Sequence, residues 1–365
     1  MAARTPPDPG GGEGSPPSAP ARPGAMSPGA YPGAPGGAVT ARDLARHLGV
    51  SQSMVSRAFS PGASIAPGMR ARVLAAAEAM GYRPNFIAAS LSRRRSSLVG
   101  LVMGELANPF YPAVLERLSQ ALQAEGFQTL LFTEPPGQEA DACLPLLRQY
   151  HVDAVVVTSA SLSSAGAAHW LGDGRAAVLF NRAAAGDTPL DSIACDNVAG
   201  GRMAAEALLA RGRQRPAFIA GRADTSTSRE REAGFFAAFA ERGLPPPRRL
   251  DAADYSYGAG HRAVLAAAEA KPDGMFFAND ILALGGLDAL RHGLGRRVPR
   301  DVSVIGFDDI PMAAWPAYDL ATLRQPVAEM VAATVALLRA RLSGAAGGPP
   351  HSERLAATLV ARGSL

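Results

Sequence analysis

Polar side chains recur along one face of the short segment 52–58, and their chemistry suits the edges of DNA bases. Gln52, Ser53, Ser56 and Arg57 carry an amide, two hydroxyls and a guanidinium, all able to form hydrogen bonds. A glutamine amide can donate to and accept from adenine, and an arginine can reach a guanine edge or a phosphate. This face reads bases only if a helix presents it outward and neighbouring elements hold that helix.

Two short helices joined by a tight turn are predicted to position this face. Thr40 is a helix-capping residue, and Asp43 three residues later completes a capping box. Gly49 suits the left-handed position that ends the first helix, and Ser51 caps the second. The pattern indicates a helix-turn-helix whose second helix fits a major groove, although a helical hairpin in an ordinary bundle has the same pattern. The predicted inward residues are Leu44, Ala45 and Leu48, then Met54, Val55 and Ala58.

Positive charge is concentrated in the same part of the chain. Residues 39–96 hold nine arginines against Asp43 and Glu78, a net charge of +7, whereas the whole chain carries +4. A polyanionic partner requires such a basic segment, and a solvated basic face without a partner is the alternative. Pro67 fits the first turn of a third helix, and Ala66 before it lacks a capping side chain.

Two segments outside the predicted helices have distinct compositions. Residues 1–38 are rich in proline, glycine, alanine and serine without hydrophobic periodicity, which predicts a disordered tail. Residues 85–96 combine helix-forming residues with three consecutive arginines. Such a segment is too short to be a stable helix alone, so we expect a hinge helix and linker. The helix-turn-helix domain is therefore assigned to residues 39–84 and the remaining domain to residues 97–365.

The remaining domain alternates apolar strands with amphipathic helices. This order is typical of parallel sheets with helical crossovers, and the number of units favours two α/β subdomains. The predicted strands are 98–103, 128–132, 153–157, 176–180, 216–220, 274–277 and 302–306, and the predicted helices include 112–125, 198–211, 230–242 and 281–292.

Several function classes lack their sequence signals. Cys143 and Cys195 lie in apolar settings that favour buried, unbridged thiols, and the six histidines are scattered, so no metal site is expected. Dinucleotide and nucleotide phosphate-binding loops and a serine-nucleophile elbow are missing, so we expect neither an enzyme nor a cofactor. Without a signal peptide or a membrane-length apolar run, the protein is expected to be cytoplasmic and to have no membrane partner.

Short motifs in a fixed order resemble the lactose-repressor (LacI/GalR) family of bacterial transcription regulators from about Val39 to the C-terminus. This resemblance implies a homodimer that reads a near-palindromic double-stranded DNA operator. It also implies a periplasmic-binding-protein-like core that binds a small-molecule effector, most often a sugar. The motifs are Val-Thr-Ala-Arg-Asp-Leu-Ala-Arg-His-Leu-Gly-Val-Ser (39–51), Val-Ser-Arg (55–57), Met-Gly-Tyr-Arg-Pro-Asn (80–85), Ala-Asn-Pro-Phe-Tyr (107–111), Cys-Asp-Asn (195–197), Phe-Ala-Asn-Asp (277–280), Val-Ile-Gly-Phe-Asp-Asp (304–309), Leu-Arg-Gln-Pro (323–326) and Leu-Val-Ala-Arg (359–362).

The resemblance also implies roles for individual DNA-binding residues. Gln52 and Ser53 match the family's base-reading pair, and Leu91 matches a leucine that wedges into the minor groove at the operator centre. A solvated Gln52, and a Leu91 that packs on the core, are the alternatives. Thr40, Ser51 and Ser56 are expected at phosphates, Arg57 at a guanine or phosphate, and Asn85, Ala88, Arg93 and Arg94 in the hinge region.

Matching positions in the core imply a polar effector cleft. Asp308 can accept hydrogen bonds from sugar hydroxyls and Arg231 can bind hydroxyls or an anion, although Arg229 could take its place. Asp308 and Asn279 could instead cap helices, with Asp280 or Asp309 as rival ligands. Phe110 and Tyr111 could be core or dimer contacts. The expected effector site is Asn108, Phe110, Tyr111, Asn181, Arg231, Tyr255, Asn279, Asp308 and Gln325.

The sequence therefore predicts a ligand-controlled repressor with a first subdomain of about 97–195 and 327–350 and a second of about 196–322 and 351–365. A solute-binding protein without a DNA role, and an enzyme on an α/β core, are the competing classes. The basic helix-turn-helix segment disfavours the first of these, and the missing acid/base pair disfavours the second.

Overall fold

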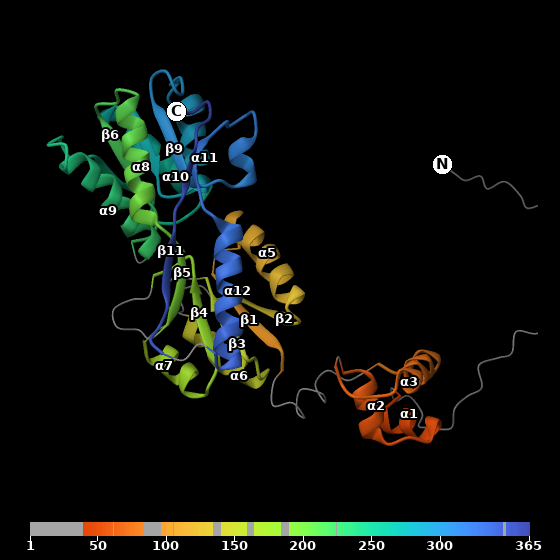
Figure 1. The fold of residues 1–365 in the computed structure, drawn as a ribbon. Helices are drawn as coiled ribbons and strands as arrows, with labels where there is room; N and C mark the ends of the chain where they lie inside the picture. The colour runs from red at the N-terminus through yellow and green to blue at the C-terminus, as the bar shows by residue number, and fades with distance from the viewer. Residues whose placement is uncertain are drawn as a thin grey trace, which may run out of the picture. The chain divides into compact units, whose positions relative to one another are not determined.

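A computed structural model describes residues 39–60, 62–83, 96–104, 106–133, 140–158, 164–183, 190–223, 225–345 and 348–365. The chain forms two compact units, whose described parts are residues 39–83 and 96–365 (Figure 1). The predicted tail (1–38) and the hinge segment up to residue 95 lie outside the described residues.

The first unit contains three helices, as the sequence predicts. Leu44, Val55 and Val73 are fully buried and join the three helices into one small core. Gly49 ends the first helix in the left-handed conformation, with φ of 66°. The helices are α1 (Ala41–Leu48), α2 (Gln52–Ala58) and α3 (Pro67–Met80).

The second unit is built on two mostly parallel sheets, which confirms the predicted α/β class. In the first sheet every neighbouring pair of strands is parallel. Its order is β11 (Ser352–Leu355), β5 (Asp191–Cys195), β4 (Ala176–Phe180), β3 (Ala154–Val157), β1 (Leu98–Met103) and β2 (Gln128–Thr133). Its helices are α5 (Phe110–Ala124), α6 (Leu144–Gln149), α7 (Ser164–Gly172) and α12 (Val327–Ser343), with the 3₁₀ turn η1 (Ala140–Cys143).

The second sheet repeats this plan with one antiparallel strand, β12, at its edge. The order is β12 (Thr358–Val360), β10 (Ala321–Arg324), β9 (Ser303–Asp308), β8 (Gly274–Phe277), β6 (Pro216–Ala220) and β7 (Arg248–Asp251). Its helices are α8 (Asn197–Ala210), α9 (Ser226–Ala240), α10 (Tyr257–Ala266) and α11 (Asp280–Asp288), with the short turns η2 (Ala268–Ala270), η3 (Ala289–Gly293) and η4 (Pro311–Ala314).

The C-terminal segment corrects one predicted boundary. We expected residues 351–365 to belong wholly to the second subdomain, but β11 pairs with β5 of the first sheet. Only β12 joins the second sheet, where it pairs with β10. The chain therefore crosses between the subdomains after β5, after β10 and again between β11 and β12 (Figure 1).

Other predicted features are close to those observed. Helix α9 begins at Ser226 rather than at Glu230, and the regular α-helix α11 ends at Asp288, before a π-helical turn. Cys143 and Cys195 are buried and unbridged, as expected. Among the described residues, no helix is both long and apolar enough to span a membrane.

Candidate functional site: a DNA-reading face and a polar cleft

Helix α2 presents the polar face that the sequence predicts for base contact. Gln52, Ser53, Ser56 and Arg57 are all exposed. Arg57 makes one local hydrogen bond, from Nε to the Ser53 carbonyl at 3.4 Å. This weak bond leaves the side chain available to a partner, so the face can meet a base edge without breaking the fold.

The capping residues hold this face in place. Ser51 accepts a hydrogen bond from the Met54 amide at 3.3 Å. Thr40 and Asp43 form the predicted capping box, in which the Asp43 carboxylate accepts from the Thr40 hydroxyl at 2.6 Å. Hydrogen bonds from Thr40 therefore hold the pKa of Asp43 below its usual value. Ala66 provides no side-chain cap for α3, as predicted.

Arg70 has a structural role that its sequence context does not indicate. Its guanidinium donates to the carbonyls of Ala58, Ser60 and Ala63 at 2.9, 3.2 and 3.0 Å. These bonds tie the end of α2 to α3. Among the arginines counted as a basic face, this one is engaged inside the protein. A count of basic residues in the sequence cannot distinguish such an arginine from exposed ones, because the carbonyls that accept its hydrogen bonds come together only in the folded protein.

The predicted hinge residues cannot be placed in the same way. Asn85, Ala88, Leu91, Arg93 and Arg94 lie outside the described residues, so their roles stay predictions.

A small inner chamber lies between the two sheets of the core. Its position follows from topology, because polar residues directly after parallel strands meet at the carboxyl edge of a sheet. Asn181 follows β4, Asn279 follows β8, and Asp308 ends β9. The chamber brings together eight of the nine predicted residues: Asn108, Phe110, Tyr111, Asn181, Arg231, Tyr255, Asn279 and Asp308.

Asp308 lies at the centre of a buried polar network. Gln325, the ninth predicted residue, donates from Nε2 to Asp308 Oδ1 at 2.7 Å. The Arg231 guanidinium lies 3.6 Å from the same oxygen, and both side chains are almost fully buried. Asp308 also has φ of 122°, which residues other than glycine rarely adopt. A buried carboxylate, guanidinium and amide in contact form a constellation suited to hydroxyl groups.

Arg231 is held from several sides. Its Nε donates to Asn197 Oδ1 at 2.9 Å, Nη1 donates to the Ala278 carbonyl, and its guanidinium carbon lies 3.5 Å from the centre of the Phe307 ring. Arg229 instead is exposed and donates to the Ala223 carbonyl at 3.1 Å. Of these two arginines, Arg231 lines the inner chamber and Arg229 does not, which favours Arg231 as the predicted effector ligand.

Glycines bring the helix that carries Arg231 close to its neighbour. A Cβ on Gly201 of α8 would collide with the Arg231 carbonyl, and a Cβ on Gly234 of α9 would collide with the Val198 carbonyl. The two helices therefore pack backbone to backbone. This contact fixes the place from which the Arg231 side chain reaches the chamber.

A second buried carboxylate lies behind Asp308. Asp280 accepts hydrogen bonds from Thr322 Oγ1 at 2.6 Å and from the Ile310 amide at 2.9 Å. Burial and, to a smaller extent, the charge of Asp308 together raise the pKa of Asp280 to about 7. Burial also raises the pKa of Asp308 to about 6, against the opposing effects of Arg231 and Gln325. Through the Ile310 amide, Asp280 holds the loop that follows β9 in place. Its side chain does not line the inner chamber.

Several predicted ligands also have local structural roles. Asn279 caps α11 by accepting from the Leu282 amide at 3.2 Å, and Asn108 Oδ1 accepts from the Phe110 amide at 3.1 Å. Phe110 and Tyr111 are buried core residues whose rings also line the chamber. The structural roles of these residues are therefore present, and their contact with an effector stays a prediction. Asp309 binds Arg324 and Arg362 in ion pairs, away from the inner chamber.

Two further residues, Arg182 and Thr227, line the inner chamber and are absent from the predicted effector site. Arg182 belongs to the first subdomain and donates to Tyr111 Oη at 2.9 Å and to Thr227 Oγ1 of the second subdomain at 3.1 Å. Arg182 directly follows Asn181 at the end of β4, so its position beyond a buried strand was an available signal. Thr227 lies in the first turn of α9, and nothing local distinguishes it from the serines and threonines around it.

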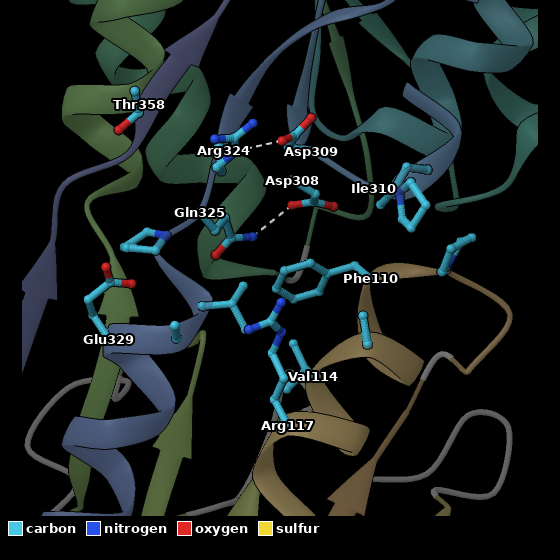
Figure 2. A pocket seen from close by; sticks show the side chains of 16 residues that line it. Phe110, Val114, Arg117, Asp308, Asp309, Ile310, Arg324, Gln325, Glu329 and Thr358 are labelled. Carbon is cyan, nitrogen blue, oxygen red and sulfur yellow. Dashed lines mark hydrogen bonds and ion pairs between the residues drawn. The ribbon is translucent and has the colours of Figure 1, made fainter. Parts of the chain in front are cut away.

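A larger outer chamber of about 440 Å³ adjoins the inner one (Figure 2). Phe110 and Asp308 line both chambers. Helices α5 and α12 provide one side of the outer chamber, and the ends of β9 and β10 provide the other (Figure 2). The inner chamber offers only about 10 Å³. This is about the space that one water molecule needs, so a larger ligand enters it only when the subdomains separate.

Known protein families match both units. Residues 40–85 match the profile described as bacterial regulatory proteins, lacI family, and residues 205–365 match a periplasmic binding protein-like domain. The regulator GalS of Salmonella typhimurium is 31% identical over 314 residues, which span 85% of this chain and 91% of that protein.

Solved structures agree with these matches. The lac repressor dimer bound to operator and the anti-inducer ONPF superposes with a TM-score of 0.80 at 25% identity, over 90% of this chain and 99% of that chain. The complex of the regulator CelR with cellobiose gives a TM-score of 0.67 at 29% identity, over 89% of this chain and 99% of that chain.

Proposed function

This chain belongs to the lacI family of bacterial regulatory proteins, and we propose that it is a dimeric repressor whose operator affinity is set by a sugar bound in the inner chamber. It is a DNA-binding transcriptional regulator. The observation that carries the sugar proposal is the buried Asp308–Arg231–Gln325 network between the two sheets. The cellobiose bound by CelR supports the same class of effector.

The helix-turn-helix unit would read the operator through the exposed face of α2. Gln52 and Ser53 would contact base edges, and Arg57 a guanine or a phosphate. Thr40, Ser51 and Ser56 would position the unit on phosphates. In the hinge, Leu91 would wedge into the minor groove, beside Ala88 and Asn85, while Arg93 and Arg94 would bind phosphates.

The effector would act by changing the separation of the two subdomains. Arg182 and Thr227 already join the two sides of the inner chamber by a hydrogen bond. A sugar must displace or extend this contact, because the chamber as it stands is too small for a ring. At one distance between the two subdomains the hinge segment would be ordered, and at another distance it would not. Effector and operator would then influence each other's affinity by the same factor.

The remaining features of the proposal follow from this mechanism. A dimer matches a near-palindromic operator, and the lac repressor binds its operator as a dimer. A regulator of this kind acts where the chromosome lies, so we place it in the cytoplasm. Its relatives are regulators rather than enzymes, and we propose that this chain binds its effector without turnover.

Selection from randomised duplex DNA, followed by sequencing at two salt concentrations, tests the proposal. We expect an enriched palindrome and a complex that weakens steeply with salt, because phosphate contacts release counterions. Sugars are then titrated into the protein–operator complex. Sequence-blind binding with and without cell metabolites would contradict the regulator assignment, and an operator complex that responds to no sugar would contradict the effector class.

A further inference from the structure

The outer and inner chambers share the lining residues Phe110 and Asp308, and one buried acceptor lies beside Asp308. Gln325 is 3% exposed and donates through Nε2 to Asp308. Its Oε1 is buried and, among the described residues, has no hydrogen-bond donor. Gln325 lines the outer chamber, where Figure 2 shows it beside Asp308. Because this oxygen is buried, a ligand hydroxyl reaches it only when the subdomains separate, and an acceptor that lacks a donor favours that contact.

The walls of the outer chamber combine apolar surfaces with charged side chains. Phe110, Val114 and Ile310 provide apolar contact, and Arg117 extends from α5 into the same space (Figure 2). Within the described part of the chain, the side chains of Arg117 and Glu329 form no ion pair and no hydrogen bond. A pyranose ring has apolar faces and a rim of hydroxyls, so it matches both features of these walls.

The balance of charge separates a neutral sugar from a phosphorylated one. Three carboxylates, those of Asp308, Asp309 and Glu329, line the outer chamber beside the guanidiniums of Arg117 and Arg324. Asp309 already pairs with Arg324 at 2.6 Å. One uncommitted arginine opposite an uncommitted glutamate provides no net attraction for a phosphate, whereas both can bind hydroxyl groups.

We propose that the outer chamber binds a second sugar unit, so that the effector is a disaccharide or another glycoside rather than a free monosaccharide. This inference rests on the proposed function, because it takes the inner chamber to hold the first ring. The first ring contacts Asp308 and Arg231, and the glycosidic bond passes Gln325. The second ring lies between α5 and the first turn of α12, with volume to spare for a unit of that size.

Calorimetric titration of the full-length protein tests this inference with cellobiose, maltose and lactose against glucose and galactose. We expect at least one disaccharide to bind ten or more times more tightly than its component monosaccharides. Ala113→Trp fills the outer chamber from an exposed position on α5 and should reduce that preference at least tenfold. Ala124→Trp, at an exposed position of the same helix outside the chamber, is the matched control and should keep the preference.

Equal affinity for monosaccharide and disaccharide, unchanged by Ala113→Trp, would overturn the inference and leave the proposed function standing. Tighter binding of glucose 6-phosphate than of every disaccharide would also overturn it, in favour of an anionic effector. If no sugar binds wild type or Asp308→Asn while palindromic DNA is still selected, the sugar effector itself fails, and the second ring fails with it. Loss of disaccharide binding in Asp308→Asn with retained DNA binding supports the sugar effector, and loss of the disaccharide preference in Ala113→Trp but not in Ala124→Trp supports the second ring.

Discussion

The DNA-reading face and the effector cleft place their functional side chains in opposite ways. Gln52, Ser53, Ser56 and Arg57 lie within one helix, exposed and weakly bonded to the protein. Arg231 and Asp308 come from distant parts of the chain, are almost fully buried, and hold each other. Specificity on α2 can therefore change at little structural cost, whereas the cleft joins recognition to the stability of the core.

The sharpest test of this difference is removal of Arg231. Arg231→Met leaves the Asp308 carboxylate buried without its guanidinium, so we expect the core to lose about 3–5 kcal/mol of unfolding free energy and its effector binding. Denaturant unfolding and calorimetry measure the two effects. Arg229→Met, two residues earlier on the same helix, is the control and should change neither. Equal losses in both variants would show that the buried network has no special role.

A substitution on the DNA-reading face should change DNA recognition and leave the stability of the protein unchanged. Gln52→Ala should change the preference for one operator base by about 1–3 kcal/mol, because a bidentate amide contact is lost. Effector affinity and unfolding should stay as in wild type, since Gln52 is exposed. Binding to operators with single base changes measures this. Uniform weakening on all sequences would instead assign Gln52 to the phosphate backbone.

Stability should depend on pH with opposite signs in the two regions. In the core, burial raises the pKa of Asp280 to about 7 and of Asp308 to about 6, so the folded state binds more protons than the unfolded chain. The contribution of these two carboxylates to core stability is then fully present below about pH 4 and is lost as pH rises towards 7, by about 1.4 kcal/mol per pH unit for each proton concerned. Asp280→Asn should flatten this slope in denaturant unfolding.

In the helix-turn-helix unit the sign is reversed. The pKa of Asp43 is lowered by the hydrogen bonds from Thr40, so its contribution is present at neutral pH and is lost as pH falls below the ordinary value of 3.8. In the full-length protein, Asp43→Asn should abolish the loss of helix-turn-helix stability at acid pH, which denaturant unfolding at several pH values measures. An acid-side loss that Asp43→Asn leaves unchanged would contradict the sign assigned to Asp43, and an Asp280→Asn variant with an unchanged slope would contradict the sign assigned to the core.

The smallest expected effect concerns the missing cap of α3. Ala66→Ser supplies a side-chain acceptor to the first turn and should stabilise the helix-turn-helix unit by up to about 1 kcal/mol. Ala71→Ser, at an exposed position within the same helix, is the matched control and should lower stability by a few tenths of a kcal/mol, because serine is a weaker helix former. Thermal unfolding distinguishes the two.

Local signals in the sequence predicted the elements whose causes are local. The capping box at Thr40, the left-handed Gly49 and the apolar strands such as β1 and β3 follow from patterns of a few residues. Strands β7 and β11 contain mainly polar residues, because they form sheet edges where burial is partial, so hydrophobicity did not reveal them. These two strands form because their backbones hydrogen-bond to a neighbouring strand.

The cleft residues required more than local pattern. Their assignment came from family resemblance, which favoured Arg231 but left its neighbour Arg229 as an alternative. Arg182 escaped notice because its partner Thr227 lies 45 positions later, in the other subdomain. Contacts of that kind depend on how two sheets face each other, which the sequence encodes only through the whole fold.

The burial of both native thiols makes the molecule a convenient frame for site-specific labelling. Cys143 and Cys195 are buried, and burial raises the pKa of Cys195 to about 12, so it carries almost no reactive thiolate at neutral pH. A cysteine introduced at an exposed position on each side of the cleft would therefore take a maleimide dye in preference to either native residue. Energy transfer between two such dyes would report the opening of the cleft in real time.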